Sequence, residues 1–187
     1  MILAGNQPYF LPYLGWWQLL KAADIFLIAD DYNFIKSGWI ARNRILVEGK
    51  PYFFRIEIKR GGSNRLINRL ELLPVNVKKK LKTLEFAYRK APFFENGYTL
   101  AERILAYPES NLSLFLENSI REVCSYLGIT TPLERHQTLK ATLFSNGRAA
   151  FTTLATGLEP THISTLSVEH HYTTKTISPV RASHLNS

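Results

Sequence analysis

The chain has 187 residues, of which 45% are hydrophobic and 20% charged, a composition typical of a globular domain and not of a disordered or fibrous protein. No apolar run is long enough to span a bilayer, and the single cysteine, Cys124, excludes an internal disulfide framework, so we expect a cytoplasmic protein. The net charge of +8 is spread along the chain, which does not single out a nucleic-acid-binding face.

The first elements of the chain predict a parallel βαβ unit. Met1–Gly5 reads as a short apolar strand, and Pro12–Ala23 begins with prolines and continues as an apolar helix. In Asp24–Ala29, a continuous apolar run follows the carboxylate of Asp24 and ends before that of Asp30, which is typical of a strand buried on both faces. Strand, helix and buried strand in this order indicate two parallel strands joined by a crossover helix.

A hairpin follows. Trp39–Val47 and Tyr52–Ile58 flank the turn-like tetrapeptide Glu48-Gly49-Lys50-Pro51. The second run alternates apolar and charged residues, so we expect one face of the hairpin to be exposed to water.

Three helices are predicted next. Pro74–Arg89 has apolar residues at helical spacing, Tyr98–Leu105 is a shorter amphipathic segment, and Asn111 and Gly128 are the expected caps of a third helix. Cys124 lies beside the apolar stripe of that helix and is interpreted as a structural thiol. The predicted fold class is α/β: a mixed sheet with a βαβ start and a hairpin, covered by helices, and followed by an irregular C-terminal tail.

The composition changes near residue 131. All five histidines lie after this position, whereas all three aspartates and all three tryptophans lie before it. Residues 152–187 are rich in Thr, Ser and His and sustain no helical or strand periodicity. We therefore predict an α/β domain over residues 1–133 and an unstructured segment over residues 134–187.

Polar residues follow the two predicted parallel strands. Asn6 and Gln7 come after the first strand, and Asp30 and Asp31 come after the second. Ligands of open parallel sheets bind at the carboxyl ends of the strands, so these residues are candidates for a site. Paired carboxylates can hold a metal, act as a general base or accept hydrogen bonds from a sugar. The alternative is that one aspartate caps the following turn.

Arg42 and Arg44 should lie on one face of the hairpin and Asn43 on the other, because side chains alternate along a strand. Two guanidinium groups on one face can hold a phosphate or carboxylate. The alternative is ion pairing with Glu48 or Glu57 across the hairpin.

Aromatic residues are dense near the N-terminus. Tyr9, Tyr13, Trp16 and Trp17 can stack on a sugar or a base, but a tryptophan pair within a helix is more often part of a core. The glycine-rich stretch from Arg60 to Arg65 lacks the spacing of a phosphate-binding loop and is interpreted as a connection.

These N-terminal motifs resemble those of the WbqC-like protein family. The family opening, Q-P-x-Y-x-P-x-x-G, corresponds to Gln7–Gly15 with Phe10 in place of the tyrosine, and its carboxylate pair corresponds to Asp30-Asp31. Its W-x-x-R-N-x-I stretch corresponds to Trp39–Ile45, and Asn6 stands where many members have histidine or methionine. The resemblance covers about residues 1–133.

The resemblance implies a cytosolic transferase that modifies an amino-sugar nucleotide in O-antigen or surface-polysaccharide biosynthesis. It implies catalytic roles for Gln7, Asp30 and Asp31. The residues it implies in substrate binding are Asn6, Tyr9, Lys36, Trp39, Arg42, Asn43 and Arg44. The expected partner is a small nucleotide sugar, and we assign no metal ligand and no cofactor from the sequence.

The family's C-terminal segment, of the form C-x-x-LGA-x-x-YINPIGG-x-x-LY, is absent from the printed sequence. It reappears if the third base of each codon from Phe151 onward is joined to the first two bases of the next, with permitted codon choices. Leu158-Glu159-Pro160 can then encode LGA, and His162 to Glu169 can encode YINPIGG. We therefore hypothesise that a frameshift puts the chain out of frame from between Glu134 and Phe151, which leaves the family domain truncated and inactive. The alternative is a native disordered tail.

A second class of function, the binding of a polyanion without catalysis, is an alternative to the transferase. The run Lys78–Lys82 on the first of the three helices can make the chain a non-catalytic module that binds a polyanion such as a nucleic acid. A solvated helix face explains the same run more simply.

Overall fold

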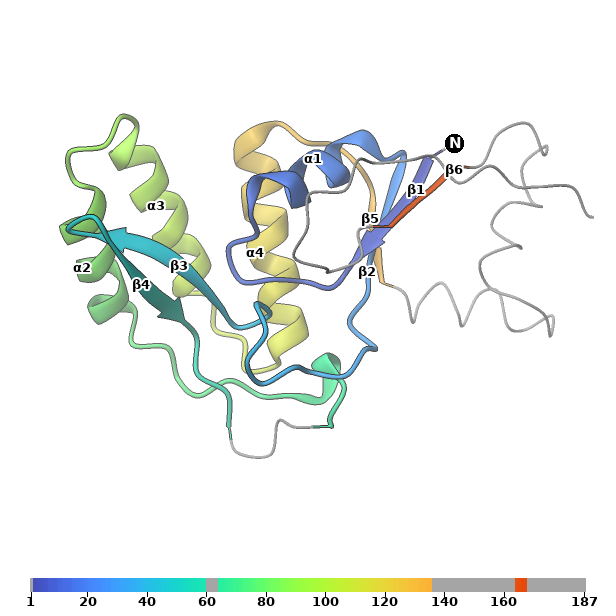
Figure 1. Ribbon diagram of the computed structural model, residues 1–187, viewed down its shortest axis with the longest axis horizontal. Helices are drawn as coiled ribbons and strands as arrows, with labels where there is room; N and C mark the ends of the chain where they lie inside the picture. Colours follow the sequence, from blue (N-terminus) through green and yellow to red (C-terminus); the bar gives the residue numbers. More distant parts are fainter. Residues whose placement is uncertain (1, 60–63, 136–163, 168–187) are drawn as a thin grey trace, which may run out of the picture. The chain divides into compact units, whose positions relative to one another are not determined.

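The computed structural model describes residues 2–59, 64–135 and 164–167, which divide into two compact units (Figure 1). Unit 1 consists of the described residues within Met1–Asn6, Tyr13–Ala29 and Thr131–Ser187. Unit 2 consists of those within Gln7–Pro12 and Asp30–Thr130. Both units are therefore built from segments that are distant in the sequence.

Unit 1 is a parallel four-stranded sheet in the order β5-β2-β1-β6. The central pair is β1 (Ile2–Asn6) and β2 (Ile25–Ile28), which align so that Asn6 lies opposite Ile28. The outer strands are β5 (Leu133–Arg135) and β6 (Ser164–Ser167). The predicted parallel pairing of the first two strands is confirmed.

Helix α1 (Leu14–Ala22) connects β1 to β2 and starts two residues after the predicted Pro12. The indole ring of Trp16 is fully buried, and its centroid lies 5.0 Å from that of the Phe26 ring in β2. Trp16 is thus a core residue of unit 1, as the alternative interpretation of the tryptophan pair predicted. All of Phe26, Leu27 and Ile28 are buried, which confirms the prediction of a doubly covered strand.

Unit 2 contains the hairpin of β3 (Arg42–Val47) and β4 (Lys50–Arg55), which forms a sheet of its own. The turn is shorter than predicted, because Lys50 and Pro51 already pair with β3 and only Glu48 and Gly49 connect the strands. Both turn residues have positive φ angles, 50° and 75°, which suit a two-residue hairpin turn.

Three helices complete unit 2: α2 (Val77–Tyr88), α3 (Phe94–Leu105) and α4 (Leu112–Leu127), preceded by a short 3₁₀ turn, η1 (Ile67–Arg69). Helix α2 runs beside the hairpin (Figure 1), where the Tyr88 hydroxyl accepts a hydrogen bond from the Leu46 backbone N–H at 3.2 Å. An Arg103–Glu122 pair with an N–O distance of 2.9 Å joins α3 to α4.

Helix α4 has the predicted boundaries. The Asn111 side chain accepts a hydrogen bond from the Leu114 N–H at 3.1 Å, and Gly128 ends the helix with φ of 63°. Its stripe of Leu112, Phe115, Leu116 and Ile120 is fully buried and supplies much of the core of unit 2.

The α/β class, the βαβ start and the hairpin are confirmed. Of the predicted irregular tail over residues 134–187, residues 136–163 and 168–187 lie outside the described residues, and the described residues belong to the end of β5 (Glu134 and Arg135) and to β6. Most of the Arg60–Arg65 connection, residues 60–63, also lies outside the described part.

Candidate functional site

Four residues of unit 2, Trp39, Arg42, Arg44 and Phe53, form what we call the arginine–aromatic cluster. Arg44 lies directly opposite Phe53 across the hairpin, and Arg42 is two residues earlier on the same face of β3. The Arg42 Cζ atom is 4.7 Å from the centroid of the Phe53 ring and 5.8 Å from that of Trp39. The Arg44 Cζ atom is 5.3 Å from both ring centroids.

Both guanidinium groups are therefore within cation–π range of the same two rings, whose centroids are 6.5 Å apart. The prediction that Arg42 and Arg44 share a face is confirmed. The residue opposite Arg42 is Arg55, and the Arg42 guanidinium donates to the backbone oxygens of Gly38, at 3.1 Å, and Ser37. These contacts take the place of the ion pairs with Glu48 or Glu57 that the alternative interpretation proposed for Arg42.

The cluster is open to solvent and positively charged. Phe53 is 43% exposed, and the side chains of Arg44 and Arg55 are exposed as well. Neither β3 nor β4 contains an acidic residue, so three arginines share this face without a carboxylate from the two strands. An open face with fixed cations and aromatic rings is suited to a ligand that combines an anion with a flat ring.

Asn43 points to the opposite face of β3. Its amide nitrogen donates to the backbone oxygen of Leu11, and its amide oxygen accepts from the Arg44 N–H at 2.7 Å. The Phe10 N–H donates to the Ile40 oxygen at 2.8 Å, and Leu11 has a positive φ of 55°. Asn43 therefore positions the segment Gln7–Pro12, and its predicted contact with substrate stays a prediction.

A second group of polar residues surrounds Asp30, which is 1% exposed. The Asp30 Oδ2 atom accepts a hydrogen bond of 2.6 Å from the hydroxyl of Ser113, a fully buried residue in the first turn of α4. The Asp30 backbone oxygen accepts from the Asn68 N–H at 3.0 Å, which ties η1 to the same place. The carboxylate is thus held by α4 and not by the backbone of the turn that follows it.

Unused hydrogen-bonding capacity remains at this place. Among the described residues, no partner is found for the Asp30 Oδ1 atom or for the side-chain nitrogen and oxygen of Asn68, although all three atoms are buried. Buried polar atoms without partners are costly, so a ligand hydroxyl or amine that reached them would be bound favourably. We therefore treat Asp30, Asn68 and Ser113 as the second part of the candidate site.

The other predicted residues are placed as follows. Strands β1 and β2 end at the same edge of their sheet, so Gln7 and the pair Asp30-Asp31 follow neighbouring strand ends, as predicted. Gln7 and Asp31 are half-buried, Asn6 is the last residue of β1, Tyr9 is 3% exposed and Lys36 is exposed. Burial of Tyr9 favours a core role over stacking on a ligand.

Three residues of the candidate site were missed by the sequence analysis. Phe53 could have been found, because the alternation in β4 puts it on the same face as Arg55. Ser113 and Asn68 carried no local signal, because their contacts with Asp30 join positions far apart in the chain.

Cys124 is buried in α4, and burial raises the pKa of its thiol, an effect that the nearby Arg121 partly opposes. A raised pKa disfavours the nucleophilic thiolate, which supports the structural interpretation. Within the described ranges, no three residues among His, Cys, Asp and Glu gather into a metal-binding group. Nor does the described part include a helix of the length and apolarity needed to cross a bilayer.

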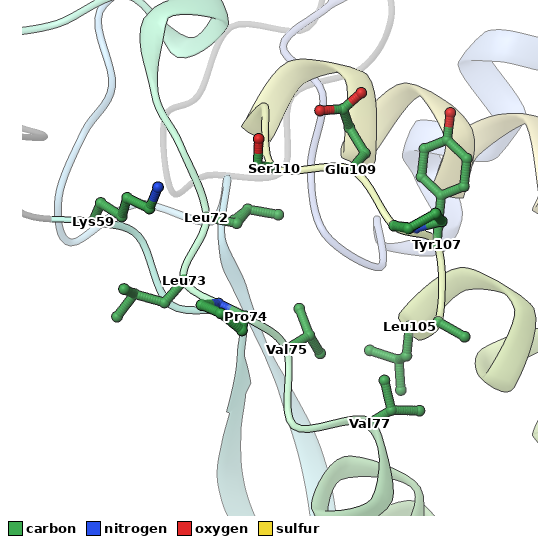
Figure 2. A pocket seen from close by; sticks show the side chains of 12 residues that line it. Lys59, Leu72, Leu73, Pro74, Val75, Val77, Leu105, Tyr107, Glu109 and Ser110 are labelled. Carbon is green, nitrogen blue, oxygen red and sulfur yellow. The ribbon is translucent and has the colours of Figure 1, made fainter.

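Unit 2 also has a cavity of about 340 Å³, with apolar walls that include Leu72, Val75, Val77 and Leu105 (Figure 2). Lys59 lies at one side of it and Glu109 at another. The Lys59 ammonium pairs with Glu71 at 2.6 Å, and Glu109 accepts from the Asn111 N–H at 2.8 Å. None of the residues predicted for the site lines this cavity.

Comparison with known proteins confirms the family that the N-terminal motifs resemble. The model of the WbqC-like protein family matches residues 7–176, so the match extends beyond residue 133, where the resemblance was expected to end. The uncharacterized protein Rv1507c of Mycobacterium tuberculosis (strain ATCC 25618 / H37Rv) is 32% identical over 130 residues, which are 68% of this chain and 56% of that protein. The chain thus spans little more than half the length of this relative. No solved structure matches the chain. On these matches, the chain belongs to the WbqC-like protein family.

Proposed function

We propose that unit 2 binds a nucleotide sugar and that the protein is a transferase that modifies an amino-sugar nucleotide for O-antigen or surface-polysaccharide biosynthesis. The observation that carries this proposal is the arginine–aromatic cluster. Its two guanidinium groups can hold a diphosphate through charge-assisted hydrogen bonds. The exposed ring of Phe53 and the adjacent Trp39 can stack on the base.

The Asp30 group is the proposed catalytic part. In a transfer to a sugar amine, the amine nitrogen bonds to the transferred group while the bond between that group and the donor's leaving group breaks, and a carboxylate beside the nitrogen can accept the proton that the nitrogen loses. Asp30 has an oxygen without a partner in the described part of the chain and is held in place by Ser113, so it is suited to this role. Gln7 and Asp31 are proposed to hydrogen-bond the sugar.

The test is isothermal titration calorimetry, which measures the affinity of the chain for UDP, GDP, dTDP and CMP sugars. We expect saturable binding of at least one of them that changes little at moderate salt. Arg44→Gln should weaken it at least about tenfold, since a hydrogen bond to a charged group is worth about 1.5–3 kcal/mol. Lys82→Gln, an exposed change on α2, is the matched control. Equal binding by the Arg44 and Lys82 variants would contradict the proposal.

The second candidate function is polyanion binding through α2. The observation that favours it is the exposure of Lys78, Lys79 and Lys82 on this helix. It predicts that a single-stranded oligonucleotide binds with an affinity that falls steeply with salt and is insensitive to Asp31→Ala. Such behaviour, without nucleotide-sugar binding, would favour this function over the transferase.

We also propose that residues 134–187 are read out of frame. The shifted reading from Phe151 and the concentration of all histidines after residue 131 support this proposal, whereas the family-model match up to residue 176 favours the alternative of a native segment. Sequencing the source DNA from the codon of Gly128 to beyond that of Ser187 tests it. A missing or extra base would support a frameshift and predict that the corrected chain regains activity, whereas DNA without a readable second frame would refute it.

A further inference from the structure

Unit 2 contains a further cavity of about 650 Å³, which shares Phe53 with the arginine–aromatic cluster and Lys79 with the exposed lysines of α2. Strand β4 forms one side of it, with Tyr52, Phe53 and Arg55 among the lining residues. The first turns of α2 form the other side, with Lys79 and Lys80. Its volume is in the range of cavities that hold small ligands and cofactors.

The charged residues that line this cavity are mostly cations. Arg55, Lys79 and Lys80 face a single carboxylate, that of Glu57. The excess of fixed positive charge on the walls favours a ligand with at least two negative charges, such as a diphosphate.

Lys80 is held at the wall of the cavity. Its ammonium group donates to the backbone oxygen of Arg55 and lies 5.1 Å from the centroid of the buried Phe54 ring. Burial is the main cause that lowers its pKa; Arg55 and Lys79 lower it further, and Glu57 opposes them. A partly desolvated cation among other cations is stabilised when an anion binds beside it.

The cavity adjoins the arginine–aromatic cluster through shared residues. The Phe53 ring lies against the guanidinium groups of Arg42 and Arg44, and Phe53 also lines the cavity. Arg55, opposite Arg42 in the hairpin, lines it too. The cavity and the arginine–aromatic cluster therefore share Phe53, and the hairpin contributes cations to both: Arg42 and Arg44 to the cluster and Arg55 to the cavity.

We propose that the cavity between β4 and α2 is a second anion site, which binds a phosphorylated co-substrate through Lys79, Lys80 and Arg55. The proposed binding of the phosphate groups rests on the lining of the cavity alone. That the phosphorylated molecule donates the group that is transferred rests on the proposed function.

The experiment uses inorganic pyrophosphate as the probe and the whole chain. Acetic anhydride labels accessible lysines, and mass spectrometry measures how far pyrophosphate protects each of them. We expect saturable protection of Lys79 and Lys80, but not of Lys78 or Lys82, which are on the same helix and do not line the cavity. The protection of Lys80 should fall at least about fivefold in Arg55→Gln and stay within about twofold in Arg44→Gln, since one charge-assisted hydrogen bond is worth about 1.5–3 kcal/mol.

Calorimetry gives an independent readout. Lys80→Gln should weaken the binding of pyrophosphate at this site at least about tenfold, with Lys21→Gln, a change on an exposed side chain of α1, as the matched control. If the circular dichroism spectrum shows that Lys80→Gln disturbs the fold, the binding of pyrophosphate is measured in Arg55→Gln instead, because the Arg55 side chain is exposed. Equal protection of all four lysines, or none, would overturn the proposal. The nucleotide-sugar titration with Arg44→Gln tests the proposed function, and the pyrophosphate experiments test this cavity. Either proposal can therefore be refuted without the other.

Discussion

The hydrogen bond between Ser113 and Asp30 gives the sharpest test of how the candidate site is held together. Ser113→Ala removes the donor and leaves the Asp30 carboxylate buried without it, since Asp30 is 1% and Ser113 0% exposed. Hydrogen bonds to charged groups contribute about 1.5–3 kcal/mol, and a buried acceptor without its partner keeps its desolvation cost. We expect the free energy of unfolding to fall by about 2–3 kcal/mol.

The assay is urea unfolding followed by far-UV circular dichroism. Ser125→Ala is the matched control, because it removes the same hydroxyl from an exposed position of α4 and should change the free energy by no more than about 0.5 kcal/mol. A double-mutant cycle with Asp30→Ala, which removes the acceptor, isolates the interaction of the two side chains. If Ser113→Ala costs less than about 0.5 kcal/mol, or if the two changes are additive, this hydrogen bond does not hold Asp30 in place and our reasoning is wrong.

Three further predictions concern residues outside that pair. Asn43→Ala should lower the free energy of unfolding by about 1–3 kcal/mol, because the Leu11 oxygen and the Arg44 N–H lose their partner; an unchanged urea midpoint would contradict this. Gly128→Ala should cost about 1 kcal/mol from backbone strain alone, since φ is 63° and an added Cβ meets no atom within 4 Å; a stabilised protein would refute it. Because burial raises the pKa of Cys124, iodoacetamide at a pH of about 8 should alkylate it at least about tenfold more slowly in folded than in urea-unfolded protein, and equal rates would show an open thiol.

Local patterns in the sequence predicted much of the fold. Asn111 and Gly128 marked the ends of α4, and the apolar run before Asp30 marked a buried strand, because caps and periodicity act over a few residues. The face shared by Arg42 and Arg44 followed from strand alternation in the same way.

The parts that escaped prediction depend on contacts between distant residues. Nothing near Ser113 indicates that its hydroxyl meets a carboxylate 83 positions earlier. The turn at Glu48-Gly49 was placed too broadly, because Lys50 and Pro51 resemble turn residues and their pairing with β3 is decided by the hairpin register. The partner strand of β1 on its second side, β6, comes from a stretch with no strand pattern at all.

The residues of the candidate sites and the last two strands of the parallel sheet are encoded in different parts of the gene. Every residue of the arginine–aromatic cluster, the Asp30 group and the β4–α2 cavity lies between Asp30 and Thr130. Two strands of the parallel sheet, β5 and β6, are encoded only after that point. A genetic lesion downstream of Thr130 would therefore change two strands of unit 1 and leave the codons of all three residue groups unchanged.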